Sequence, residues 1–130
     1  MNFPDMISKV ITHLELRGEK INQQHWVNAG RNYVIVTNER TYLVKWNDKP
    51  FFAAGRLVAG LGPGIGLTID FQTVENFSKH DDAYILFTWT ETDHIYFQTM
   101  EGFNKLSKIH TQRNGEVEKV ILVQSLLRWI

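Results

Sequence analysis

Residues 32–46, NYVIVTNERTYLVKW, determine how the middle of this chain folds. β-Branched and aromatic residues, which favour extended backbone, occupy both halves of the stretch. In the first half both alternating sets of side chains are largely apolar, which is typical of a strand covered on both faces. The polar residues 37–40 between the halves are suited to a tight turn. The stretch therefore predicts an antiparallel hairpin in which residues 33–37 pair with residues 41–45.

A helix is expected before the hairpin, over residues 4–17. Its apolar residues follow the i, i+3, i+4, i+7 spacing that places side chains on one helix face. They are Ile7, Val10, Ile11 and Leu14. Asn2 or Asp5 is suited to cap the start of this helix, and Gly18 is suited to end it.

Four further strands are expected from short runs of β-branched and aromatic residues bounded by turn residues. They are residues 25–30, 83–89, 94–100 and 116–123. The polar segment TETD joins the second of these to the third, so we expect those two to be antiparallel neighbours in the same sheet as the hairpin.

Two further helices are expected in the second half of the chain. Asp70 is suited to cap one that runs through Lys79, and Thr99 to cap one that runs to about His110. Their inward residues are expected to be Phe71, Val74, Phe77, Met100, Phe103 and Leu106. Residues 49–60 fit either a short helix or an interrupted strand, and residues 125–130 fit a short helix or a tail. The glycines and proline of GLGPGIG, residues 60–66, predict a loop.

The expected order is α-β-β-β-α-β-β-α-β. This order predicts an α/β or α+β fold with a single mixed central sheet flanked by helices. A chain of 130 residues is most simply one domain, residues 1–130.

Composition restricts the function classes. Basic and acidic residues number 14 each, so the net charge is zero, which argues against a general nucleic-acid coat protein. The chain has no cysteine, which excludes disulfides and cysteine zinc sites and fits a cytoplasmic protein. The first residues show no secretory pattern, and no apolar run approaches the roughly 18 residues of a membrane span, so we expect no membrane partner.

The helix, the hairpin ending in YLVKW, the next helix and the pair YILFTW and IYFQTM resemble the PD-(D/E)XK, or restriction-endonuclease-like, superfamily. The resemblance implies two carboxylates that hold Mg²⁺ and a lysine that helps activate water. Lys45 matches the lysine. Leu43 stands where the resemblance implies an acid, and the first aspartate would fall near Asn32 or Tyr33. Both acids of the pattern are therefore missing, and we expect no tight metal site and no cofactor at the hairpin.

Acids from elsewhere in the chain offer an alternative. Glu15 and Asp70 are the candidates that, with Lys45, would rebuild a Mg²⁺-dependent nuclease site. Glu39, in the hairpin turn, would lie roughly 20 Å from Lys45 at about 3.3 Å per strand residue, which is too far to share a metal. Trp46 follows Lys45 directly, so its side chain must lie on the opposite face of the strand.

We expect a binding site rather than an enzyme's active site. The candidate binding residues are Lys45, Lys49, Arg56, Gly62 and Gly64. The glycine-rich loop is expected to be mobile, since glycine loses the most backbone freedom on folding. The preferred hypothesis is a small non-catalytic binding protein whose ligand is nucleic acid or a protein partner. The alternatives are the Mg²⁺-dependent nuclease and a homo-oligomeric adaptor or structural module.

The apolar closing segment VILVQSLLRWI predicts self-association. An apolar chain end must pack on its own core or on another chain, and a two-fold dimer is the commonest closed assembly. We therefore expect a homodimer with Leu127, Trp129 or Ile130 at or beside the interface.

Overall fold

The computed structural model describes residues 1–27, 32–53, 58, 60–79 and 82–130. Three α-helices, one 3-10 turn and ten strands occur in these residues. The helical segments are α1 (Phe3–Leu16), α2 (Phe71–Phe77), α3 (Met100–Leu106) and the 3-10 turn Val123–Ser125. The strands are β1 (Ile21–Val27), β2 (Asn32–Thr37), β3 (Thr41–Asn47), β4 (Phe51–Ala53), β5 (Gly64–Asp70), β6 (Tyr84–Trp89), β7 (Tyr96–Thr99), β8 (Lys108–Thr111), β9 (Val117–Leu122) and β10 (Leu127–Arg128).

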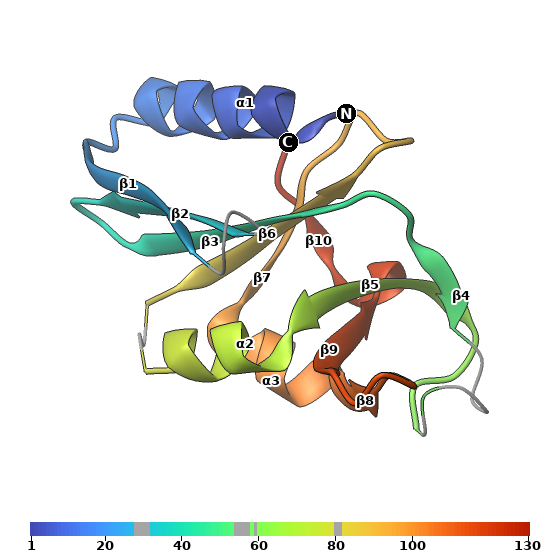
Figure 1. Ribbon diagram of the computed structural model, residues 1–130. Helices are drawn as coiled ribbons and strands as arrows, with labels where there is room; N and C mark the ends of the chain where they lie inside the picture. Colours follow the sequence, from blue (N-terminus) through green and yellow to red (C-terminus); the bar gives the residue numbers. More distant parts are fainter. Residues whose placement is uncertain (28–31, 54–57, 59, 80–81) are drawn as a thin grey trace.

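The strands form two sheets (Figure 1). The six-stranded sheet has the order β1-β2-β3-β6-β7-β10, and β3 and β6 are its parallel pair. The four-stranded sheet has the order β4-β5-β9-β8 and is antiparallel throughout. The expected mixed α/β fold with flanking helices is thus confirmed, while the expectation of a single sheet is wrong. Four of the strands pair with one another in a second sheet and are not part of the six-stranded sheet.

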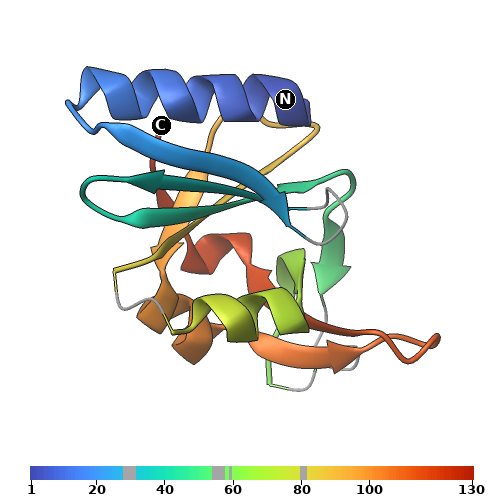
Figure 2. The ribbon, with the colours of Figure 1, turned by 60° about the vertical axis from the view of Figure 1, so that its left-hand side comes forward.

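The six-stranded sheet is covered on both faces. α1 lies on one face, and the four-stranded sheet lies on the other together with α2 and α3, as Figures 1 and 2 show. The core under α1 consists of Met6, Val10, Leu14, Ile35, Tyr42, Val44, Leu86 and Ile95. The core on the other face consists of Val34, Leu43, Leu67, Ile69, Val74, Phe77, Ala83, Ile85, Phe87, Met100, Phe103, Ile121 and Leu126. Because both faces are buried, β2 and β3 need apolar side chains in both alternating sets.

The predicted hairpin is confirmed. β2 and β3 are antiparallel, with Tyr33 opposite Val44 and Ile35 opposite Tyr42. β6 lies beside β3 in the same sheet, and β7 is the antiparallel neighbour of β6, as expected.

Local signals account for α1. The Asn2 side chain accepts a hydrogen bond from the Asp5 backbone N–H at 2.8 Å, which satisfies one of the unpaired donors at the helix start. Gly18, with φ of 81°, follows the last turn in the left-handed conformation that glycine adopts without strain. The buried stripe is Met6, Val10 and Leu14, while Ile7 and Ile11 are only half-buried. The buried face of α1 is therefore rotated toward Met6 relative to the face that the sequence predicted.

Several segments differ from expectation. The first strand is β1 at Ile21–Val27, whereas it was expected at residues 25–30, of which 28–30 lie outside the described part of the chain. α2 ends at Phe77 instead of continuing to Lys79, and Leu106, which was expected to face inward, is exposed. Residues 64–66 form the start of β5 and not a loop. Gly66 is needed there because a Cβ atom would lie only 3.0 Å from the ring of Phe51. α3 ends at Leu106 instead of continuing to His110, and β8 follows at once. Residues 125–130 form no closing helix, because β10 pairs with β7. β5 and β10 pair with strands remote in sequence, and β8 pairs with β9 across a short turn; these pairings override the local preferences.

The chain end packs on its own core. Trp129 lies against the core under α1, where its ring centroid is 4.6 Å from that of His13. The Ile130 backbone N–H donates to the Ile95 carbonyl at 3.2 Å. Leu127 remains exposed, so the expected homodimer is still a prediction, with Leu127 as its apolar contact residue. None of the helices in the described residues has the length and apolar character needed to cross a membrane.

Candidate functional site

A small polar cavity lies where the end of β3 meets β5 and β9. It encloses about 160 Å³. Its lining residues are Asn32, Lys45, Thr68, Ile69, Asp70, Gln112, Glu116, Val117 and Glu118. The cavity brings together Lys45 and Asp70, two of the residues singled out from the sequence.

The hairpin positions one wall of the cavity. Asn32, the first residue of β2, lies directly opposite Lys45 in the strand register. Leu43 is on the same face of β3 as Lys45 but is 0% exposed and belongs to the core. Trp46 has the opposite orientation: its Nε1–H donates to the Met1 carbonyl at 2.8 Å, and its ring packs against the α1 side. The predicted separation of Lys45 and Trp46 onto two faces is confirmed.

Asp70 joins the cavity because β5 ends there. Its Oδ2 accepts hydrogen bonds from the Thr73 backbone N–H at 3.0 Å and from the Thr73 hydroxyl at 3.1 Å. Asp70 is therefore the N-cap of α2, as the sequence predicted. In the β5–β9 register Asp70 lies opposite Glu118, so two carboxylates face each other across this edge.

Protein donors hold the Glu118 carboxylate from two sides. His110 Nδ1 lies 3.0 Å from Oε1, and Gln112 Nε2 donates to Oε2 at 2.8 Å. These three residues come from the β8–β9 hairpin, which projects from the body in Figure 2. Sequence reasoning missed them, although alternating polar residues in HTQ and EVE are a signal for one polar strand face.

Asn32 is the unusual member of the cavity. It is 0% exposed, yet neither Nδ2 nor Oδ1 of its amide has a hydrogen-bond partner among the described residues. A buried polar group without a partner costs about 1–3 kcal/mol. Such a group is expected to meet a ligand or a water molecule.

The other residues proposed from the sequence lie outside this cavity. Glu15 and Glu39 are exposed, and Glu15 is on α1, which covers the opposite face of the sheet. Lys49 is exposed in the connection between β3 and β4, and Arg56 lies outside the described residues. Gly62 precedes β5 and Gly64 begins it, at the opposite end of this strand from Asp70. Within the described part of the chain, no three histidine, aspartate or glutamate side chains are grouped so that they could hold a metal.

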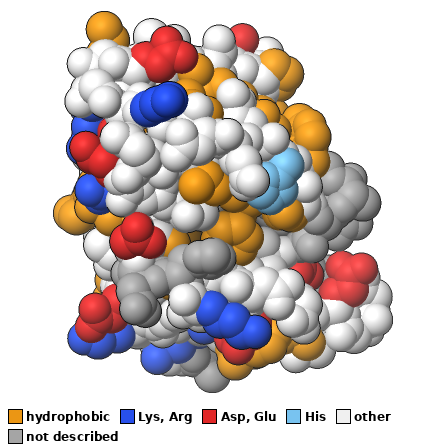
Figure 3. All heavy atoms as spheres, turned by 90° about the vertical axis from the view of Figure 1, so that its left-hand side faces the viewer, with side chains coloured by type: hydrophobic (Ala, Val, Ile, Leu, Met, Phe, Trp, Pro, Cys, Tyr) orange, Lys and Arg blue, Asp and Glu red, His pale blue; other side chains and the backbone are white. Residues whose placement is uncertain are grey.

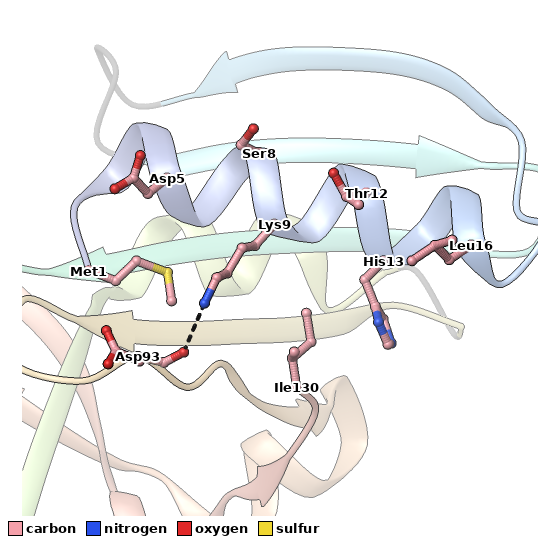
Figure 4. A pocket seen from close by; sticks show the side chains of 9 residues that line it. All are labelled: Met1, Asp5, Ser8, Lys9, Thr12, His13, Leu16, Asp93 and Ile130. Carbon is pink, nitrogen blue, oxygen red and sulfur yellow. Dashed lines mark hydrogen bonds between the residues drawn. The ribbon is translucent and has the colours of Figure 1, made fainter.

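A second hollow is a groove beside α1 (Figure 4). It encloses about 530 Å³ and is lined mainly by apolar atoms. Its lining residues are Met1, Asp5, Ser8, Lys9, Thr12, His13, Leu16, Asp93 and Ile130. The Lys9 ammonium crosses the groove and donates to the Asp93 carbonyl at 3.3 Å. Burial, and then the nearby Arg17, lower the pKa of His13 below its ordinary value.

The surface carries mixed charge. On the face drawn in Figure 3, the described Lys and Arg side chains are interspersed with Asp and Glu, and apolar side chains lie between them. This face therefore carries no extended field of one sign.

Comparisons of the chain with protein-family models, with curated proteins and with solved structures found no match.

Proposed function

We propose that this protein binds nucleic acid at the polar cavity and does not cleave it. The observation that carries the proposal is the buried, unpartnered amide of Asn32 opposite Lys45. The amide offers one donor group and one acceptor, and the lysine offers a positive charge. A ligand that pairs with the amide and contacts the lysine presents a neutral polar edge beside an anionic group.

Nucleotides have that combination. Phosphate oxygens accept from lysine, and the edges of bases pair with asparagine amides. A peptide backbone can pair with the amide but brings no regular negative charge for Lys45. The carboxylates of Asp70, Glu116 and Glu118 also line the cavity, so a phosphate is expected on its Asn32–Lys45 side. The volume of about 160 Å³ suits one phosphate-sized group with part of its neighbour.

The order of elements also supports the proposal. α1 and the antiparallel strands β1, β2 and β3 are followed, after β4 and β5, by α2 and by β6, which is parallel to β3. The PD-(D/E)XK superfamily, which the sequence resembles, acts on nucleic acids. Asn32 and Lys45 occupy the ends of the hairpin strands where that resemblance implies the site.

Binding without cleavage is favoured by the state of the acids. Leu43 fills one acid position with a core side chain. Both oxygens of Glu118 interact with His110 and Gln112, and Asp70 Oδ2 caps α2. A cation at this place would have to displace hydrogen bonds to charged groups, which contribute about 1.5–3 kcal/mol each.

Fluorescence anisotropy with labelled DNA and RNA tests the proposal. Lys45→Ala is expected to weaken binding roughly ten-fold and to reduce the slope of log affinity against log salt by about one. Lys9→Ala is the matched control, because Lys9 lies in the groove on the other face of the sheet. The Lys9→Ala protein should bind nucleic acid as tightly as the unmodified protein does. Equal affinity of the Lys45→Ala protein, or no binding of any nucleic acid, would overturn the proposal.

A metal-dependent nuclease is the second candidate. One observation favours it: Asp70 and Glu118 lie opposite each other in the strand register and line the cavity that contains Lys45. It predicts that calorimetry detects Mn²⁺ binding that Asp70→Asn abolishes, and that labelled DNA is cut only when the metal is added. Intact DNA after incubation with Mg²⁺ or Mn²⁺ would reject the nuclease and leave the binding proposal in place.

A further inference from the structure

Trp26 is a braced but exposed aromatic side chain at the edge of the six-stranded sheet. It lies on β1 and is 51% exposed. Its ring makes edge contacts with Phe3, at 5.2 Å between centroids, and with Tyr33, at 4.8 Å. The Tyr33 hydroxyl is in turn bound to Gln24 at 2.9 Å. These contacts hold the indole in one orientation while about half of its surface meets solvent.

The strand that carries Trp26 has the chemistry of a nucleic-acid surface. β1 is the outer strand of the sheet, and residues 22–26, NQQHW, are exposed. This run contains three amide side chains, an imidazole and an indole, and no acid. Amides, histidine and aromatic rings contact bases and sugars, and the absence of acids avoids repulsion of phosphates.

Trp26 also lies close to the polar cavity. In the strand register Val27, the next residue, is opposite Asn32, and Asn32 is opposite Lys45. Neighbouring strands are about 4.8 Å apart, so the backbones of Val27 and Lys45 are separated by about 10 Å. Trp26 is on the α1 side of the sheet and the cavity is on the other, so a chain that contacts both must pass around the end of the sheet.

We infer that the ligand is single-stranded nucleic acid, with one base stacked on Trp26 and the backbone passing on to Lys45. This inference rests on the proposed nucleic-acid binding. A single strand has unstacked bases and a flexible backbone, so it can turn around the sheet end and offer a base to the indole. In a duplex the bases are already stacked on one another, so none of them can stack on Trp26.

Anisotropy titrations with a labelled oligothymidylate and with a labelled duplex test the inference. Trp26→Ala is expected to weaken single-strand binding roughly ten-fold and to leave duplex affinity unchanged. Trp26→Phe keeps a ring and should recover most of the affinity. Phe52→Ala is the matched control, since Phe52 is an aromatic residue of similar exposure on the other sheet. Circular dichroism and thermal denaturation establish that each variant is folded.

Three results would overturn the inference. One is unchanged single-strand affinity of Trp26→Ala while Lys45→Ala loses binding, which leaves the proposed function standing. Another is an equal loss for single strand and duplex. A third is a change in the mass measured by light scattering on Trp26→Ala, which would assign the patch to contact between copies of the chain. If no nucleic acid binds at all, both the inference and the proposed function fail.

Discussion

Buried polar side chains lie at both ends of β2, but the two ends differ in the hydrogen bonds that these side chains receive. At the Thr37 end, the carboxylate of Glu19 is 4% exposed, and its Oε1 accepts hydrogen bonds from the Thr37 hydroxyl at 2.9 Å and the Tyr42 hydroxyl at 2.8 Å. At the other end, the Asn32 amide is completely buried and has no partner. One strand therefore has a satisfied polar group at its end and an unsatisfied one at its start.

Three side chains, those of Thr37, Tyr42 and Arg17, surround the Glu19 carboxylate. Tyr42 also contacts Oε2 at 2.9 Å, and Arg17 Nε lies 3.9 Å from the same oxygen. Burial, followed by the hydrogen bond to Glu19, raises the pKa of Tyr42 well above its ordinary value. The phenol therefore remains protonated and acts as a donor. Arg40 completes the region with its guanidinium 4.4 Å above the Tyr84 ring.

The difference separates structural polar groups from groups available to a ligand. A buried charge that receives all its hydrogen bonds from the protein contributes to a single folded arrangement. A buried amide without partners lowers stability, and its cost is recovered only when something binds. On this basis the Glu19 cluster is assigned to folding, and the Asn32 cavity is the site that we propose for ligand binding.

The largest effect is expected from Glu19→Ala. The buried Tyr42 hydroxyl would lose its acceptor and the Thr37 hydroxyl one of its two, so we expect the free energy of unfolding to fall by about 3 kcal/mol. Urea denaturation measures it. Glu39→Ala, in the exposed turn that follows Thr37, is the control and should change stability by less than about 0.5 kcal/mol. A similar small change for both variants would show that the Glu19 cluster is not structural.

Asn47→Leu is expected to have the next largest effect. Asn47 is 7% exposed, and its Oδ1 accepts from the Thr68 backbone N–H at 3.2 Å and the Thr68 hydroxyl at 3.3 Å, which joins the two sheets. Leucine would leave the Thr68 groups without an acceptor, so the free energy of unfolding should fall by about 1–3 kcal/mol in the same denaturation measurement. An unchanged midpoint would mean that this link between the sheets has no role in stability.

Asn32→Leu should behave in the opposite way, although it replaces the same residue type on a neighbouring strand. Removing an unpartnered amide from a buried place is expected to leave stability unchanged or to raise it by about 1 kcal/mol. Affinity for nucleic acid should fall in the same protein. A stability loss as large as that of Asn47→Leu would show that the Asn32 amide is satisfied in solution.

The smallest effect concerns pH at the Glu19 end. His13 lies near Arg17 and Glu19, and burial first and Arg17 second lower its pKa in the folded chain, while Glu19 opposes them. The unfolded chain therefore takes up the proton more readily. Stability that is present above the ordinary pKa of about 6.5 should decline as pH falls below it and level off below the folded pKa.

Thermal denaturation across this range measures the dependence. His13→Gln should flatten the dependence, whereas Thr12→Gln, an exposed neighbour on α1, should not change it. An undiminished slope in His13→Gln would assign the acid sensitivity to other groups.

The sequence predicted the elements whose causes are local. The spacing of apolar residues, the Asn2 cap and Gly18 define α1, and the alternation in residues 32–46 defines the hairpin. Asp70 was predicted as a cap because an aspartate before an amphipathic turn satisfies the helix start without help from the rest of the chain. Of the candidate site, Lys45 and Asp70 were singled out in this way.

Only the tertiary structure decided the remainder. The second sheet consists of residues 51–53, 64–70, 108–111 and 117–122, and it depends on the pairing of β5 with β9, which are far apart in the chain. The meeting of Asp70 with Glu118, and of Glu118 with His110, follows from strand register. Register is set by which faces become buried when the two sheets pack, and the local pattern of β5, with its glycines, carries no such information. For the same reason the amide of Asn32 has no signature in sequence: whether a buried asparagine finds a donor or acceptor in the protein depends on the side chains that the fold places around it.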